Sequence, residues 1–566
     1  MFRSAFDKIN PDTYCHDHYE DYNELMGITK EQHIENMRCK LIITEELVEE
    51  LKNHESIYFG YYFNSSIDVL PSNIKNITWC TFSLFSTDIQ KFPENLESLN
   101  LTKICPGTNI CKIPDNVKVL ELPSKKINIT NIPLNIETLY LGGQTDSLEL
   151  TSQLNKLELI KKLSVGITNE DTCTDFDLTN LPPKLEILEI NSINNINLSN
   201  LPNRLRELVI ESEIDGSSLD FLPESLEQLV IKNSQNSNIN LDFLPMNLKI
   251  LIFFARKNSL PMNNLPVNLE DLDILVNSIG DSLILPPNLK KLKITTTDII
   301  SNIIFPQTLI DLTIDGKNLT NLVVLPENLT SLKIYNYTPN APLPLKLSFK
   351  LPEQLKYLNI SYNIDLEFIN LPVNLEHLIL NCEYNYVLPE LPESLKTLYL
   401  KRYSKQITKF NEGLSHLYVN QTDTNIKIPP LPENLLSLYI ESDIDTNFNI
   451  PPNLTYFGFN PKKLININSN QQKFIEKILN RMPDSVEIFT TNLDISIYTF
   501  HRLPRNLQEI GIENRHLVNS EFDFVGHFQS GGCDNNFDDI LLYLVEDYSD
   551  IRNFNKRVYA YFDNYK

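Results

Sequence analysis

The side chains that most often carry catalysis or bind metals are scattered along this chain. Its 8 cysteines form no C-x-x-C pair, and its 9 histidines are dispersed. No P-loop, G-x-G-x-x-G, H-E-x-x-H or G-x-S-x-G motif occurs. We therefore expect no catalytic residue, no metal site and no cofactor, and we interpret the protein as a non-enzyme. The C-x-x-C spacing of a zinc site and an evident disulfide framework are both missing.

The residues that could bind a partner are aromatic, and they recur at fixed places in short strand-like segments. Three tyrosines directly follow a leucine, namely Tyr399, Tyr418 and Tyr439. Four rings directly precede the equivalent leucine or phenylalanine, namely Tyr357, His377, His416 and Tyr456. Tyrosines on a rigid surface commonly form interface hot spots, although strand propensity alone also favours tyrosine there. We predict a partner-binding row of exposed rings about 5 Å apart. Replacing the three tyrosines by serine should then weaken binding without changing stability.

These aromatic residues belong to a repeated unit that reads Leu-Pro-x-x-Leu-x-x-Leu-x-Ile. Its period is mostly about 19 to 22 residues, and the apolar spacing survives without the Leu-Pro pair near Lys156 and at Phe410. With these two, about twenty-one units are present. The others start at Leu70, Phe92, Ile113, Ile132, Leu181, Leu201, Leu222, Leu244, Leu265, Leu285, Phe305, Leu325, Leu351, Leu371, Leu391, Leu431, Ile450, Met482 and Leu503.

Each unit ends in a Leu-x-Ile alternation that is typical of a short strand with one buried face. An amphipathic helix is the alternative, but a proline in every period would break it. The period is too short for a strand and a full-length helix, so the return path should be extended. The units must stack to bury their leucines, which predicts a solenoid with a curved parallel sheet of about 20 short strands, an extended convex side and small helical caps.

The repeat resembles leucine-rich repeats of the short Leu-Pro type found in bacterial effector proteins, and is similar to FNIP-type repeats of social amoebae and giant viruses. The segments Leu201-Pro202-Asn203-Arg204-Leu205 and Ile450-Pro451-Pro452-Asn453-Leu454 carry the resemblance. The FNIP resemblance implies a viral or amoebal protein, and it suggests an F-box before the repeats. Such a chain would recruit substrates for a ubiquitin ligase. A C-terminal ligase domain is not expected, because Cys533-Asp534-Asn535 departs from the relatives' motif.

We divide the chain into a partly helical N-terminal cap (1–69), a solenoid (70–512) and a C-terminal cap (513–566). Thr29 with Gln32, and Thr44 before Glu45, are the helix-start signals of the first segment. Two units are stretched. The interval 335–350 predicts a proline-rich loop, and 460–481 predicts a short helix with Phe474, Ile475, Ile478 and Leu479 facing inward.

The predicted sheet face falls into zones. Outward positions are apolar at Ile187, Val209, Val230, Ile250, Ile252 and Phe254. They are charged at Lys291, Lys293, Lys333, Asp271, Asp273 and Asp311. In the charged zone Leu292 should face the core and Lys293 the solvent.

Charge and hydropathy restrict the partners. A net charge of −24 opposes binding to nucleic acid or to an anionic membrane surface. We see no signal peptide and no apolar run of membrane-spanning length, and we expect no small-molecule ligand. The sequence therefore predicts a non-enzymatic scaffold that binds another protein on its concave face, in the cytoplasm of the host or source cell. The alternative is a ubiquitin-ligase adaptor that acts through residues 1–69.

Overall fold

The computed structural model describes residues 43–512 apart from several shorter segments, and beyond them the strand Leu541–Leu544. The longest of the segments left out are 143–153, 167–177, 192–197, 234–238, 336–344, 422–427, 442–447, 461–472 and 492–501. The chain forms two compact units, Met1–Gly280 (unit 1) and Asp281–Lys566 (unit 2). Each unit is described by itself.

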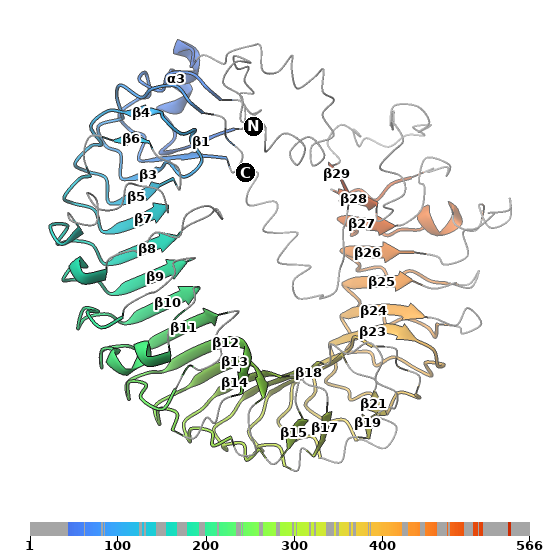
Figure 1. The fold of residues 1–566 in the computed structure, drawn as a ribbon. Helices are drawn as coiled ribbons and strands as arrows, with labels where there is room; N and C mark the ends of the chain where they lie inside the picture. Colours follow the sequence, from blue (N-terminus) through green and yellow to red (C-terminus); the bar gives the residue numbers. More distant parts are fainter. Residues whose placement is uncertain are drawn as a thin grey trace. The chain divides into compact units, whose positions relative to one another are not determined.

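Unit 1 begins its described part with helix α3 (Glu45–Leu51), and a series of parallel strands follows (Figure 1). Each strand pairs with the next one in the series. The strands are β1 (Ser56–Phe59), β2 (Asn76–Trp79), β3 (Ser98–Asn100), β5 (Val119–Leu122), β7 (Thr138–Gly142), β8 (Lys162–Gly166), β9 (Ile187–Asn191), β10 (Glu207–Glu211), β11 (Gln228–Asn233), β12 (Ile250–Ser259) and β13 (Asp271–Ser278).

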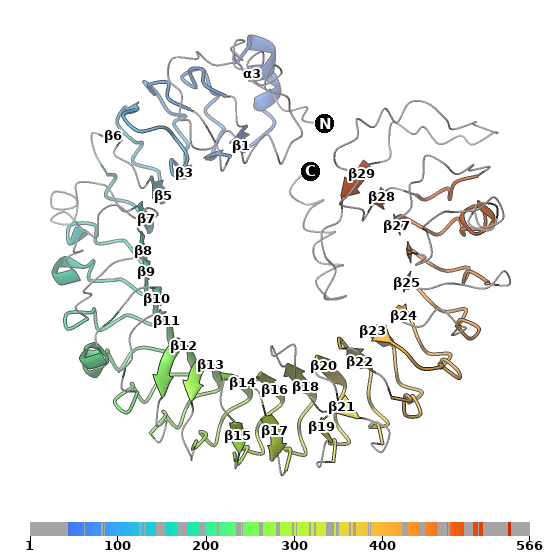
Figure 2. The ribbon, with the colours of Figure 1, turned by 45° about the vertical axis from the view of Figure 1, so that its right-hand side comes forward.

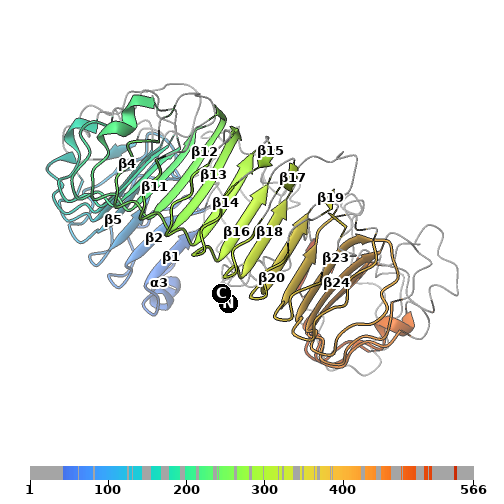
Figure 3. The same ribbon diagram turned by 90° about the horizontal axis from the view of Figure 1, so that it is seen from below.

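Unit 2 repeats the same arrangement, again with parallel pairing between successive strands (Figure 3). Its strands are β14 (Lys291–Thr296), β16 (Asp311–Asp315), β18 (Ser331–Tyr335), β20 (Tyr357–Ser361), β22 (His377–Leu380), β23 (Thr397–Tyr403), β24 (His416–Gln421), β25 (Ser437–Glu441), β26 (Tyr456–Phe459), β27 (Ile488–Thr491), β28 (Glu509–Ile512) and β29 (Leu541–Leu544).

The return path of the repeats is mostly extended, as the period predicts. In each unit the main strands line the concave side, and short pieces lie on the convex side (Figure 2). These pieces include the strand pairs β4 (Asn109–Ile110) with β6 (Asn128–Ile129), β15 (Ile299–Ser301) with β17 (Asn318–Asn321), and β19 (Leu345–Lys346) with β21 (Ile364–Asp365). The convex side of unit 1 also includes two 3₁₀ turns, η3 (Leu178–Asn180) and η4 (Gly216–Phe221).

The core follows the apolar positions of the repeat. Leu289, Leu292 and Ile294 are buried, whereas Lys293 between them is exposed, so the predicted inward and outward assignment is confirmed here. The proline carbonyl accepts the N–H of the leucine three residues later, as Pro326 does from Leu329 at 3.2 Å. This turn starts each strand and uses no N–H of the proline.

A second ladder runs along the turns and was not predicted. The asparagine before the buried leucine or valine of the turn donates its side-chain N–H to a carbonyl of the preceding repeat, as Asn116 does to Glu94 at 2.9 Å and Asn268 to Met246 at 2.9 Å. Where the residue is serine the hydroxyl takes over, as Ser394 donates to Leu375 at 2.7 Å. These bonds join each turn to the turn of the preceding repeat. They explain the recurring Asn-Leu pair.

The two degenerate repeats fit the stack as expected. Ile160, Leu163 and Val165 are buried, and so are Leu414, Leu417 and Val419. At Asn411, which stands where other repeats have proline, the side chain donates to the Leu395 carbonyl at 2.8 Å. The missing proline is thus replaced by a bond to the preceding repeat.

The ends of the sheet differ from the domain boundaries drawn from the sequence. Strand β1 lies inside segment 1–69 and pairs with β2, and β29 lies inside 513–566 and pairs with β28. The solenoid therefore extends beyond the Leu-Pro units at both ends, because β1 keeps the strand register without that pair. Thr44 caps α3 and accepts a bond from the Leu47 N–H. Thr29 and Gln32 lie outside the described residues.

The stretched unit before Met482 contains helix at 476–479, where Ile478 and Leu479 are buried as predicted. Phe474, Ile475 and the loop 336–344 lie outside the described residues. With its parallel strands, buried leucines and extended convex side, the fold is a leucine-rich-repeat solenoid. Within the described part of the chain, no helix combines the length and apolarity needed to cross a membrane.

Candidate functional site

The described residues contain no cluster of three metal-ligating side chains. His377 and His416 occupy equivalent strand positions, but Thr397 of β23 lies between them in the register. Two strand spacings separate the histidines by about 10 Å, which is too far for one metal ion. The two histidines therefore do not form a metal site, and the features of this sheet face are its side-chain packing and hydrogen bonds.

The tyrosines predicted to form a row do so on the concave face of unit 2. Tyr399, Tyr418 and Tyr439 are register partners on β23, β24 and β25. Their ring centroids are 4.1 Å and 4.4 Å apart, with interplanar angles of 14° and 5°. We call these three residues the tyrosine row. The predicted register is confirmed, and the spacing is slightly shorter than the predicted 5 Å.

The exposure predicted for this row is wrong. Tyr399 is 1% exposed, and Tyr418 and Tyr439 are each 8% exposed. The row belongs to a buried cluster with Tyr357, Ile379 and Tyr456. Substituting all three tyrosines by serine would therefore remove buried packing. The expectation that this change leaves stability untouched is withdrawn.

The position before the leucine forms a second line beside the tyrosine row. In register order it holds Tyr357, His377, Thr397, His416, Ser437 and Tyr456. His377 Nδ1 lies 2.9 Å from Thr397 Oγ1, and the rings of Tyr357 and His377 are 6.0 Å apart. We call this set of six the flanking line. His377, His416 and Ser437 are half-buried, so they are its accessible members.

Residues beyond β25 complete the row, and sequence reasoning missed them. The Tyr439 hydroxyl accepts a bond from Asn460 Nδ2 at 2.7 Å, and the Tyr456 hydroxyl lies 2.6 Å from Thr490 Oγ1. Gly458 takes the row position on β26, and a Cβ there would stand 2.3 Å from Tyr439 Cδ2. A glycine within a strand at an aligned aromatic position was the available signal.

Burial changes the titration of one histidine in the flanking line. Desolvation lowers the pKa of His416 below its usual range, and the nearby His377 lowers this pKa further. The His416 ring therefore favours its neutral form at neutral pH. Its Nδ1 lies 2.9 Å from Ser415 Oγ, so the ring is also positioned by a hydroxyl.

The zones predicted on either side are present with different exposures. Lys333 lies 3.4 Å from Asp311 and 5.8 Å from the ring centroid of Tyr357, which links the charged zone to the aromatic cluster within unit 2. In unit 1 the predicted apolar stretch is half-buried, apart from Val230, which is buried. Neither zone offers a broad exposed apolar surface.

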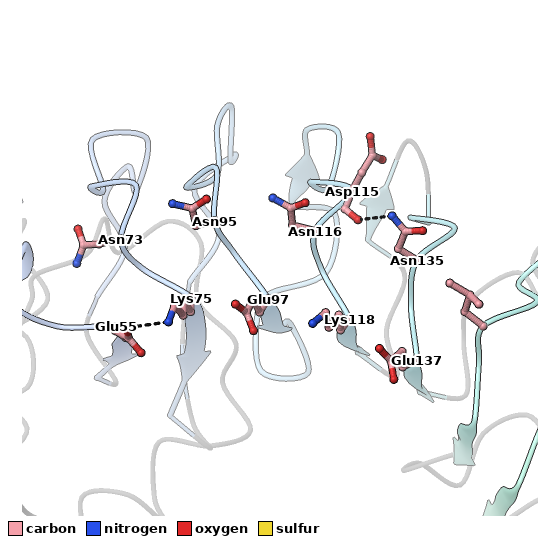
Figure 4. A pocket seen from close by; sticks show the side chains of 11 residues that line it. Glu55, Asn73, Lys75, Asn95, Glu97, Asp115, Asn116, Lys118, Asn135 and Glu137 are labelled. Carbon is pink, nitrogen blue, oxygen red and sulfur yellow. Dashed lines mark hydrogen bonds and ion pairs between the residues drawn. The ribbon is translucent and has the colours of Figure 1, made fainter.

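The described part of unit 1 contains a shallow cavity of about 690 Å³ (Figure 4). It lies along the turns at the start of the strands. Asparagines of the turn ladder line one side and alternating acidic and basic side chains line the other. The full lining is Glu55, Asn73, Lys75, Asn95, Glu97, Asp115, Asn116, Lys118, Asn135, Glu137 and Leu159. An open groove of this composition holds no convergent set of catalytic groups.

Comparisons with known proteins agree with the fold. No protein-family model matches the chain, and no curated protein sequence matches it. The crystal structure of CroV588, described as a novel circular leucine-rich-repeat protein, is similar at a TM-score of 0.52 and 22% identity, over 83% of this chain and 75% of that one. This similarity supports the leucine-rich-repeat fold alone.

Two further solved structures are similar at lower TM-scores. YopM from Yersinia enterocolitica WA-314 has a TM-score of 0.40 at 20% identity, over 84% of this chain and 99% of that one. The TLR13–ssRNA13 complex has a TM-score of 0.38 at 15% identity, over 82% of this chain and 72% of that one.

Proposed function

We propose that the protein is a non-enzymatic scaffold that binds another protein on the concave face of unit 2. The observation that carries the proposal is the tyrosine row, which stacks into a rigid support beside the flanking line, whose His377, His416 and Ser437 are half-buried. Binding surfaces require side chains held in place by a second layer of packing, and stacked rings supply that layer.

The partner contacts the flanking line, with His377, His416 and Ser437 at its centre and Tyr357 and Tyr456 at its ends. Tyr399, Tyr418 and Tyr439 act mainly as the support, and their ring edges and hydroxyls contribute at the margin. Imidazole and hydroxyl groups both donate and accept hydrogen bonds, so this line suits a polar protein surface. Since half-buried side chains lose little freedom on binding, the ordering cost of association is low.

A pair of adjacent substitutions tests this proposal. Ser437→Arg places a long cation on the concave face, whereas Leu436→Arg places the same side chain at a turn-side position that is already 43% exposed. Arg206 occupies the equivalent place in another repeat, so Leu436→Arg should be tolerated. Tagged full-length variants are used to capture proteins from the cells that make this chain, and recovery is quantified by mass spectrometry.

We expect wild type and Leu436→Arg to recover at least one protein in equal amounts. Recovery of that protein by Ser437→Arg should be lower by about tenfold or more, which corresponds to a loss of about 1.4 kcal/mol or more of binding free energy. Equal recovery by both variants, with both folded, would refute binding on this face.

Five finer predictions from the sequence remain proposals. The adaptor alternative depends on residues 1–69, of which 1–42 lie outside the described residues, and α3 with β1 already serves as the start of the stack. The resemblance to FNIP-type repeats and a viral origin also stay predictions. So do a location inside the cell and the exclusion of nucleic acid, which depends on the charge of −24.

A further inference from the structure

Unit 1 carries an unbroken alternation of charge along one line of its repeats. The residue that lies two positions before the first core leucine of each strand alternates between acid and base, in the order Glu55, Lys75, Glu97, Lys118, Glu137, Lys161, Glu186, Arg206, Glu227, Lys249 and Glu270. We call this set the charge ladder. The chain has 73 acidic against 49 basic residues, so its composition does not produce a strict alternation.

The backbone holds successive ladder residues side by side. The N–H of each ladder residue donates to the carbonyl of the ladder residue one repeat earlier, as Lys118 does to Glu97 and Glu137 does to Lys118, both at 2.8 Å. The same bond recurs from Lys75 through Glu270. Side chains of adjacent repeats therefore project next to each other, at about one strand spacing.

The side chains make use of this proximity. Ion pairs join Lys75 to Glu55 at 2.7 Å, Lys161 to Glu137 at 2.8 Å and Lys249 to Glu227 at 2.8 Å. The charged residue on the other side of each pair also interacts with it electrostatically. The pKa of Glu137 is lowered mainly by Lys161 and further by Lys118, and the pKa of Lys161 is raised mainly by Glu137 and further by Glu186. Each charge thus lies between two opposite charges.

The apolar core cannot distinguish one neighbour from the next. Leu120, Leu139, Leu163 and Leu188 fill the same position and are all buried, so a repeat could bury its leucines equally well against the repeat after its neighbour. Skipping one repeat would bring Glu beside Glu or Lys beside Lys. Like charges on adjacent strands are destabilising.

We infer that the charge ladder of unit 1 is an ordering device that directs each repeat onto its immediate neighbour and opposes pairing with the repeat after it. In unit 2 the alternation is interrupted, because Ile310, Thr330, Ser415, Leu436 and Thr455 take the ladder position. A shorter alternating run remains there, in which Glu376 pairs with Lys356 at 3.2 Å and with Lys396 at 2.5 Å.

A swap that preserves composition tests the inference in the full-length chain. Lys118→Glu combined with Glu137→Lys keeps the net charge and keeps this pair opposite, but it places Glu beside Glu97 and Lys beside Lys161. The control swaps another exposed pair of the same region, Lys112→Asp with Asp115→Lys, whose side chains are 3.1 Å apart within one turn. Amide hydrogen exchange of β5 and β7 is the readout.

We expect the ladder swap to speed exchange of β5 and β7 by about threefold or more, and the control swap to change it less than about twofold. Raising NaCl to about 1 M, where the Debye length is about 3 Å, should remove most of the difference. Unchanged exchange in the ladder swap, or a change that salt does not reduce, overturns the inference.

Inverting the sign of every charge in the ladder separates the effect of alternating charge from the effects of the individual side chains. Exchanging every ladder glutamate for lysine, and every ladder lysine or arginine for glutamate, restores opposite neighbours throughout. Exchange of β5 and β7 should return to within about twofold of wild type, even if the two-residue swap fails to fold. If full inversion is as damaging as the swap, the individual side chains matter, and the ordering role is refuted.

Discussion

At the scale of single residues, the inward and outward alternation could be predicted from the repeat. The detail of burial could not. Leu292 and Lys293 lie where the pattern places them, whereas Tyr399 is 1% exposed on a face that the pattern assigns to solvent. Alternation decides which side of a sheet a residue faces, but packing within the cluster on that side decides how far the residue is buried.

The core assignment predicts a large difference between adjacent substitutions. Leu292→Ala deletes a side chain that is 2% exposed and should cost about 2 to 5 kcal/mol of unfolding free energy. Lys293→Ala should cost under about 0.5 kcal/mol, because its side chain is exposed. Urea denaturation of both variants measures the difference, and equal losses would contradict the assignment.

Gly458 predicts a strict size limit. A Cβ at this position would stand 2.3 Å from Tyr439 Cδ2 and 2.9 Å from the Tyr456 hydroxyl oxygen. Gly458→Ala should therefore cost about 1 to 3 kcal/mol through overpacking. Combining it with Tyr439→Ala should cost less than the sum of the two single changes, because removing the ring relieves the clash. Additive losses would show that the ring is not the obstacle.

His416 predicts a dependence of stability on pH. The folded state holds the pKa of its imidazole below the ordinary value of 6.5, mainly through desolvation and further through His377. The unfolded state then binds the proton more readily, so the contribution is present above about pH 6.5 and is lost as the pH falls below that value. His416→Gln should flatten this part of the stability profile. His377→Gln should reduce the slope, because it removes the repelling charge.

Thermal unfolding between pH 5 and pH 8 measures these profiles. An unchanged slope in His416→Gln would assign the dependence to other groups.

At the scale of elements, the row of tyrosines could be predicted because the three residues take the same place in successive repeats. Strands that pair in register place such residues side by side on one face of the sheet. The function of the row as a packed support could not be predicted, because Asn460, Thr490 and Gly458 lie on later repeats and act through geometry. The asparagine ladder escaped prediction for a similar reason. Its hydrogen bonds run to backbone carbonyls of the preceding repeat. The spacing of apolar residues in the sequence does not indicate such bonds.

The stacked row predicts that ring removal and hydroxyl removal have different costs. Tyr418→Ala deletes a ring stacked on both sides, with centroids 4.1 Å and 4.4 Å away, and should destabilise unit 2 by about 3 to 5 kcal/mol. Tyr418→Phe keeps the stack and should cost under about 1.5 kcal/mol. Near-ultraviolet circular dichroism and urea denaturation report both effects. Similar losses in the two variants would place the hydroxyl, and not the stack, at the centre of the packing.

At the scale of the molecule, the solenoid architecture followed from the repeat, because a unit that cannot bury its leucines alone must stack. The ends of the stack did not follow. Strands β1 and β29 lack the Leu-Pro pair that defined the repeat, and they are recognised only by their pairing with β2 and β28. The division into two units was also invisible, because the same core positions run through both.

The central claim is that the concave face of unit 2 contacts a protein partner, and site-specific photo-crosslinking tests it most directly. A benzophenone amino acid is introduced at Ser437, on the flanking line, and in a matched variant at Leu436, on the turn side of the same repeat. Both variants are irradiated in extracts of the cells that make the protein. We predict a discrete crosslinked product from position 437 and none of equal intensity from position 436. The same product from both positions, or from position 436 alone, would contradict the claim.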